Sequence, residues 1–201
     1  MATQNTHITL NEHLLIGEGR NRKCYLHPKD LNLCIKVSSK RGLRSAKREI
    51  NYFKRLHKRG KSFAMIADYM GEIQTSEGRG DLYQLIRDHD GSISKNLEYY
   101  LSLQNASITA TMIMLIDNLR KYLIEEYILI SDLDLDNILV QKDVFGNFKL
   151  LVIDGIGDNN QIPLLEYIKP LGMKRSARKW SFFKTLVAKD FPDVAKEMKE
   201  F

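Results

Sequence analysis

The stretch Ile130–Val140, ISDLDLDNILV, decides the fold that the sequence predicts. It places Asp132, Asp134 and Asp136 at alternate positions, then Asn137, then an apolar run. Carboxylates this close repel one another unless a cation or a proton lies among them. The stretch therefore predicts a bound calcium ion, a catalytic site, or three carboxylates that only face water.

A calcium-binding loop fits this stretch poorly. An EF-hand loop needs a glycine at its sixth position and a glutamate at its twelfth. Counted from Asp132, these positions are Asn137 and Asp143. The strand-like run Ile138–Val140 also begins where such a loop should still bind the ion. Calcium is therefore the weaker alternative.

The spacing fits the catalytic loop of protein kinases, which reads Asp-x-x-x-x-Asn before an apolar strand. Asp132, Asn137 and the run Ile138–Val140 match this pattern without a gap. A hairpin is then expected to return through LLVID to Asp154, where the pattern has an aspartate that binds magnesium. Asp132 is the candidate catalytic residue, and Asn137 and Asp154 are the candidate metal ligands.

Two further signals precede this loop in the order that a kinase requires. The segment LLIGEGRNRKCYL carries Gly17 and Gly19 of a glycine-rich motif, with Arg22 at the position of the third glycine. A glycine turn between two strands lets backbone N–H groups approach phosphates without a Cβ in the way. Lys36 follows in LCIKV, on a predicted strand. A plain hairpin turn and a lysine that faces water are the alternatives.

Glu49 is the only acid among ten Lys or Arg residues between Lys40 and Lys61. On a helical wheel of residues 43–58 it lies on the apolar face, between Phe53 and Leu56. A carboxylate on that face needs a cation partner, since its burial is otherwise costly. Lys36 is the predicted partner, and a position at the edge of the core is the alternative.

The pattern of the whole chain is α+β. Strands are expected over residues 8–37, 63–75 and 81–88, with one helix at 43–58 between them. A short helix around KNLEYYLSL, a long one at 109–127, the hairpin of DNILV and FKLLVID and a helical tail follow. The first half is therefore rich in sheet and the second half is mostly helical.

Composition places the chain among ordinary soluble globular proteins, with 43% hydrophobic and 28% charged residues. No apolar run approaches the roughly 20 residues that span a bilayer. The polar start, MATQNTHITLNEH, lacks the pattern of a secretory signal. We therefore expect a cytoplasmic protein without a transmembrane segment, in which Cys24 and Cys34 are buried free thiols.

The chain resembles the protein-kinase-like superfamily and, more narrowly, the YrbL family of PhoP regulatory network proteins. The resemblance runs through LIGEGRNRKCYLHP, REINYFKRL, YQLIRDHDGSISKNLEYYL, DLDLDNILV and IPLLEYIKPL. It implies a reduced bilobal kinase-like fold. Residues 8–88 would form an N-lobe with an antiparallel sheet and one helix, and residues 89–201 a shortened helical C-lobe.

The resemblance also implies ATP and magnesium as cofactors in a cleft between the lobes. Lys36, held by Glu49, would contact the phosphates, and the loop from Gly17 to Arg22 would cover them. Asp132 would accept a proton from the attacking hydroxyl. The stretch LIRDHDG resembles the hinge of a kinase, so Ile86 and Asp88 are expected where backbone groups read adenine.

Several departures keep the function open. Ile130-Ser131 replaces the usual His-Arg, and Asp134 stands where many protein kinases have a lysine. Asp154 is followed by Gly155-Ile156, and only 47 residues come after it. Three alternatives remain: a phosphotransferase for a small or membrane-associated substrate, a pseudokinase, and a module that binds an anionic surface through its Lys40–Lys61 face. Nucleic acid is disfavoured as a partner, and the charged face is by itself compatible with simple solvation.

Overall fold

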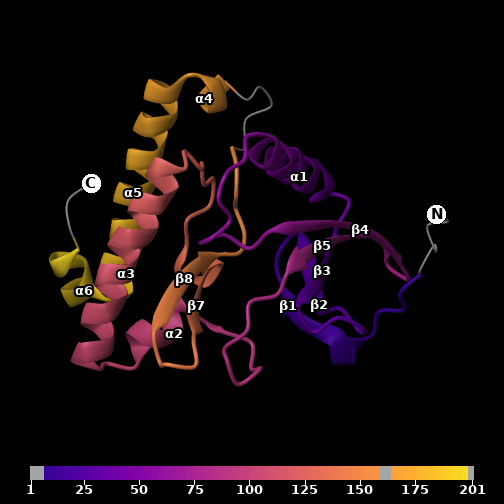
Figure 1. The fold of residues 1–201 in the computed structure, drawn as a ribbon, viewed down its shortest axis with the longest axis horizontal. Helices are drawn as coiled ribbons and strands as arrows, with labels where there is room; N and C mark the ends of the chain where they lie inside the picture. Colours follow the sequence, from indigo (N-terminus) through magenta and orange to yellow (C-terminus); the bar gives the residue numbers. More distant parts are fainter. Residues whose placement is uncertain (1–6, 159–163, 199–201) are drawn as a thin grey trace.

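The first half of the chain folds into a five-stranded antiparallel sheet with the strand order β1-β2-β3-β5-β4 (Figure 1). The structure is a computed structural model that describes residues 7–158 and 164–198. A short 3-10 helix, η1, covers Glu12–Leu14. The strands are β1 Leu15–Glu18, β2 Arg22–Leu26, β3 Leu33–Ser38, β4 Tyr69–Thr75 and β5 Gly78–Gln84.

The bounds predicted for two strands were wrong. The strand expected at 63–75 begins only at Tyr69, and the strand expected at 81–88 begins at Gly78 and ends at Gln84. For the first strand, the reason lies in the backbone hydrogen bonds of the segment before β4. Met65 O accepts from Val152 N–H and Ala67 N–H donates to Val152 O, so this segment pairs with the second half of the chain instead.

One helix, α1 (Leu43–Lys58), packs against this sheet, where Phe53 and Leu56 join Tyr83 of β5 in the core. The predicted helix bounds are confirmed. Glu49 is 8% exposed, so its predicted place on the inner face of the helix is confirmed too. The chain leaves the helix at Gly60, whose φ of 61° is a left-handed conformation that glycine adopts without strain.

The second half contains a three-stranded antiparallel sheet and most of the helices (Figure 1). The expected hairpin is confirmed as β7 and β8, and the expected long helix as α3. In order, the elements are β6 Lys95–Asn96, α2 Leu97–Ser102, α3 Ala106–Glu125, η2 Leu135–Asn137, β7 Ile138–Lys142, β8 Phe148–Val152, α4 Leu164–Tyr167, α5 Lys169–Asp190 and α6 Pro192–Glu197.

A single large core joins the two halves. Phe53 from α1, Met112 and Leu119 from α3, and Phe183 from α5 belong to the same buried cluster. The Tyr52 hydroxyl also accepts a hydrogen bond of 2.8 Å from the Leu129 backbone N–H. The segment that carries the aspartate loop is therefore fixed against α1. Across the described ranges, we find no helix with the length and apolar character needed to cross a membrane.

Two close backbone approaches bring distant segments to the same place, and each needs a glycine. A Cβ at Gly155 would lie 2.6 Å from the Asp132 carbonyl oxygen, and the residue has a φ of 69°. A Cβ at Gly42 would lie 2.5 Å from the Asn21 carbonyl oxygen. The first contact sets the aspartate loop against the end of β8. The second sets the start of α1 against the glycine turn.

The short helix α4 is held to α1 by a buried ion pair. The Glu166 side chain is 2% exposed and accepts from Arg55 Nε at 2.8 Å, Arg55 Nη2 at 2.6 Å and Arg59 Nη2 at 3.1 Å. Charge-assisted bonds of this length are strong when they are shielded from water. Two cations of the basic segment therefore have a structural partner within the protein.

We expect Glu166→Ala to lower the free energy of unfolding by about 3 kcal/mol, because it strands two partly buried guanidinium groups. Urea denaturation measures the change, and hydrogen exchange should localise the loss to α4. Asp193→Ala, which removes an exposed pair with Lys196, is the matched control and should leave the stability almost unchanged. Equal effects of the two variants would contradict the structural role of Glu166.

Candidate functional site

A cleft of about 570 Å³ lies between the glycine turn of the first sheet and the aspartate loop. This volume is in the usual range for a pocket that binds a small molecule. Eight of the ten sequence-predicted site residues line it: Gly17, Gly19, Arg22, Lys36, Glu49, Asp132, Asn137 and Asp154. The fold therefore brings together residues that lie more than 130 positions apart in the sequence.

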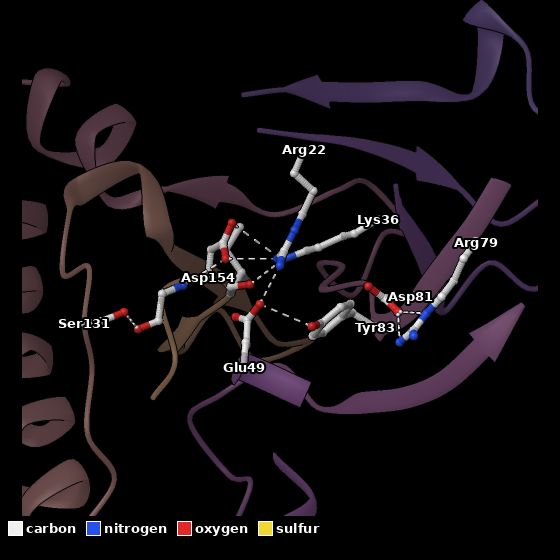
Figure 2. Close-up of polar contacts among 10 residues, drawn as sticks. Arg22, Lys36, Glu49, Arg79, Asp81, Tyr83, Ser131 and Asp154 are labelled. Atoms are coloured by element: carbon white, nitrogen blue, oxygen red, sulfur yellow. Dashed lines mark hydrogen bonds and ion pairs between the residues drawn. The ribbon is translucent and has the colours of Figure 1, made fainter. Parts of the chain in front are cut away.

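Arg22 lies between two carboxylates at the centre of the cleft (Figure 2). Its Nη2 is 2.8 Å from Glu49 Oε2, and its Nη1 is 3.3 Å from Asp154 Oδ1. The Arg22 side chain is only 15% exposed. Because the strand places this residue where a glycine was expected, a guanidinium occupies the middle of the cleft.

Lys36 reaches the same carboxylate from the neighbouring strand (Figure 2). Its Nζ donates to the Ile153 carbonyl oxygen at 2.7 Å and lies 3.9 Å from Asp154 Oδ2. The ammonium group also lies 4.6 Å from the centre of the Tyr83 ring, which is favourable for a cation. The Lys36 side chain is 8% exposed, so the alternative of a lysine that faces water was wrong.

In this structure Glu49 does not pair directly with Lys36, its predicted partner in at least one conformation. Glu49 Oε2 pairs with Arg22 and accepts from the Tyr83 hydroxyl at 3.3 Å. Lys36 extends to Asp154 instead. The physical reason is reach, since the guanidinium of Arg22 can bond both carboxylates at once and takes the place between Glu49 and the lysine. Glu49 Oε1 accepts no hydrogen bond from any described residue.

The charged groups in the cleft shift one another's pKa values. Burial raises the pKa of Glu49, against the opposing effect of the Arg22 cation. Burial would also raise the pKa of Asp154, but the cations of Lys36 and Arg22 outweigh it, and that pKa lies below its ordinary value. Burial would lower the pKa of Lys36, whereas Asp154 and Glu49 raise it. Asp154 and Lys36 are therefore held in their charged forms.

The three aspartates of the opening stretch have different surroundings. Asp132 is exposed at the cleft, and Asn137 Nδ2 donates to its carbonyl oxygen at 3.2 Å and to its Oδ2 at 3.4 Å. Asp134 caps the turn η2 by accepting from the Leu135 N–H at 2.7 Å. Asp136 lines the cleft and accepts from the Asn96 amide. Local hydrogen bonds and solvent thus separate the three carboxylates.

The structure leaves Ile86 and Asp88 outside the cleft. Ile86 is buried, and its carbonyl oxygen accepts from the Ser94 N–H at 3.1 Å. The Asp88 carboxylate accepts from the Ser94 hydroxyl and from the Lys142 N–H at 3.0 Å. These groups tie the segment after β5 to β7. They are not among the residues that the cleft brings together.

Two contributors to the site were missed from the sequence. The Ile153 carbonyl oxygen receives Lys36, and a backbone acceptor leaves no signal in residue type. The Tyr83 hydroxyl bonds Glu49 from a buried position on β5. A tyrosine in a strand usually indicates packing. A buried polar tip, which needs a partner, is the signal that could have identified Tyr83.

The donor set fits magnesium only when other ligands complete the shell. Mg²⁺ is bound through one or two carboxylates together with waters and phosphates. Asp154, whose side chain is 42% exposed, offers such a carboxylate. Asn137 donates to Asp132 through Nδ2, so its Oδ1 is the atom that could bind a metal. Within residues 7–158 and 164–198, no group of three or more His, Cys, Asp or Glu side chains could hold a metal ion.

Comparisons with known proteins give one family. The family model described as PhoP regulatory network protein YrbL matches residues 8–188. The uncharacterized protein YrbL of Escherichia coli (strain K12) is 33% identical over 180 residues, which cover 88% of this chain and 86% of that protein. The protein of the same name from Shigella flexneri gives the same values.

We expect Arg22→Gln to lower the free energy of unfolding by about 3 kcal/mol, because it leaves Glu49 and Asp154 close together with one fewer cation. Chemical denaturation measures the loss. Lys23→Gln is the matched control, since Lys23 is the next cation on β2 but is 43% exposed and lies outside the cleft. A loss below about 1 kcal/mol for Arg22→Gln would show that the bridge does not stabilise the protein.

Proposed function

The chain belongs to the family of PhoP regulatory network protein YrbL, and we propose that it binds ATP and magnesium in its cleft, within a reduced kinase-like fold. The observation that carries the proposal is the meeting of Lys36, Asp154 and Asn137 in one pocket. These residues come from three separate segments, in the order that the kinase pattern requires. The support concerns the phosphate end of the nucleotide, because Ile86 and Asp88 do not line the cleft.

Each residue has a defined task in this proposal. Lys36 gives a fixed positive charge to the phosphates, and its bond to the Ile153 carbonyl oxygen sets its position. Backbone N–H groups of the turn at Gly17 and Gly19 contact the phosphates from the side of the first sheet. Asp154 and Asn137 hold the metal. Magnesium, when bound, neutralises the phosphate oxygens.

Transfer, if it occurs, uses Asp132 as the base. The exposed carboxylate takes the proton from a substrate hydroxyl, whose oxygen forms a bond to the γ-phosphorus. The bond from this phosphorus to the bridging oxygen breaks, and ADP leaves with the electron pair. Asn137 Nδ2 holds Asp132 at 3.4 Å, which orients the carboxylate toward the cleft.

One feature favours a small or membrane-associated substrate, or binding without transfer, over ordinary protein phosphorylation. Asp134 caps a turn and is outside the cleft, so no lysine assists the transferring phosphate at this position. A pseudokinase that reports nucleotide binding to a cytoplasmic partner in the PhoP regulatory network is therefore the competing form of the same proposal.

A second candidate function is contact with an anionic surface through α1. Arg55 and Arg59 are already paired with Glu166, and Lys61 lies 3.8 Å from Glu126. The exposed cations Arg44, Lys47, Lys54 and Lys58 remain on the outer side of α1. Basic residues near an anionic bilayer contribute about 1 kcal/mol each. The outer side of α1 therefore offers fewer unpaired cations than the ten Lys and Arg residues between Lys40 and Lys61 suggest.

Nucleotide binding predicts a thermal shift. ATP at about a hundred times its dissociation constant, with magnesium present, should add about 2.7 kcal/mol to the stability of the wild type. Lys36→Ala and Asp154→Ala should each lose most of this shift. Lys23→Ala and Asp134→Ala are the matched controls, since both remove a charge outside the cleft, and they should keep it. An unchanged melting temperature at millimolar ATP and magnesium would refute the proposal.

An assay with labelled ATP separates the two forms of the proposal. We expect either labelling of one small-molecule or lipid species in cell extract, or no turnover. In the first case Asp132→Ala should lower the rate by at least about 100-fold, as the loss of a general base does. Asp134→Ala should keep the rate. Strong labelling of generic protein substrates by the wild type would contradict both forms.

Binding to vesicles tests the α1 face. If this face binds lipid, the wild type should sediment with vesicles that contain phosphatidylglycerol, and not with pure phosphatidylcholine. Replacing Lys47, Lys54 and Lys58 by glutamate should abolish the effect, and 0.5 M salt should weaken it, because exposed charges are screened. Sedimentation that survives the three substitutions would exclude α1 as the contact.

A further inference from the structure

We infer that Arg22 makes metal binding depend on the nucleotide: its guanidinium holds the Asp154 carboxylate until a phosphate takes its place. The inference rests on the proposed function and concerns the regulation of the same cleft. It starts from the residue at which the chain departs from the glycine-rich motif.

The carboxylate expected to bind the metal already has cations beside both oxygens, through hydrogen bonds on one and an ion pair on the other. Asp154 Oδ1 accepts from Arg22 Nη1 at 3.3 Å and from the Gly155 N–H at 2.9 Å. Its Oδ2 lies 3.9 Å from Lys36 Nζ. A divalent cation on Asp154 would therefore stand beside two fixed positive charges. Repulsion over such distances is large in a partly dry cleft.

The four charges of the Arg22 cluster are balanced among themselves, although the whole lining of the cleft carries more carboxylates than cations. Arg22 and Lys36 supply two positive charges, and Glu49 and Asp154 supply two carboxylates (Figure 2). A metal ion by itself adds positive charge beside Arg22 and Lys36. A nucleotide brings negative charges that offset the metal at this cluster.

The two bonds of Arg22 are unequal, and this gives the direction of the exchange. The bond to Glu49 is short, at 2.8 Å, and its acceptor is only 8% exposed. The bond to Asp154 is longer, at 3.3 Å, and its acceptor is 42% exposed. Breaking the second bond costs less, because water and a metal can reach Asp154. Arg22 therefore keeps Glu49 and transfers its other donors from Asp154 to a phosphate oxygen.

The backbone of Arg22 is fixed while this happens. Its carbonyl oxygen accepts from the Gly19 N–H at 2.9 Å, and the residue is in register with Ser38 on β3. Only the side chain has to turn. Lys36 does not need to move, since its bond of 2.7 Å to the Ile153 carbonyl oxygen is independent of Asp154.

Manganese alone is the probe that tests the block, because Mn²⁺ takes the place of Mg²⁺ and its free concentration is read by electron paramagnetic resonance. Without nucleotide, we expect Arg22→Gln to bind Mn²⁺ at least about tenfold more tightly than the wild type, since one cation has left the metal carboxylate. Arg22→Lys restores a cation and should bind as weakly as the wild type. Lys23→Gln, the control for charge alone, should not differ from the wild type.

The double variant Arg22→Gln with Asp154→Ala should lose the gain, which assigns the metal to Asp154. With ATP and magnesium, Arg22→Gln should bind the nucleotide about tenfold more weakly, because a charge-assisted bond to phosphate is gone. Equal Mn²⁺ affinity of Arg22→Gln and wild type, or tight Mn²⁺ binding by the wild type alone, would overturn the inference and leave ATP binding standing. A wild type that binds no ATP would instead refute the proposed function.

Discussion

The cleft depends on one guanidinium that joins two carboxylates. Glu49 is on a helix of the first half and Asp154 follows the last strand of the second half, and each would be costly to bury with no cation beside it. Arg22 bonds both. Lys36 provides the second cation and is itself held by a backbone carbonyl group. The four charges stabilise one another, so the cluster also helps to fix how the first sheet meets the aspartate loop.

Several parts of the fold could be predicted because they depend on local patterns. The face of α1 with its single acid, the apolar face of α3 and the β7–β8 hairpin all follow from periods of 3.6 or 2 in the sequence. The start of β4 was wrong because residues 65–67 bond to β8, and a partner distant in the sequence has no local signal. Tertiary hydrogen bonds decide such cases.

The site, like the fold, combines features that the sequence pattern predicts with contacts that only the tertiary structure decides. The order of Lys36, Glu49, Asp132, Asn137 and Asp154 identified the residues of the cleft, but not their partners. The partner of Glu49 depends on which cation the tertiary structure places beside it, and the sequence pattern had placed Arg22 only in the glycine-rich loop. The expected hinge at Ile86 and Asp88 rested on likeness of sequence. There, the backbone and side chain are used to hold neighbouring strands.

The contact of Gly42 with the Asn21 carbonyl group has a mechanical consequence. The Ser39 N–H donates to this oxygen at 2.8 Å, and the Gly42 N–H donates to the Ser39 carbonyl oxygen at 2.8 Å, so the turn and the start of the helix are linked through Ser39. A side chain at position 42 would collide with the carbonyl group of Asn21 and push the start of α1 away from the turn. The distance between the turn that borders the cleft and the helix that carries Glu49 is therefore set by the absence of one Cβ atom.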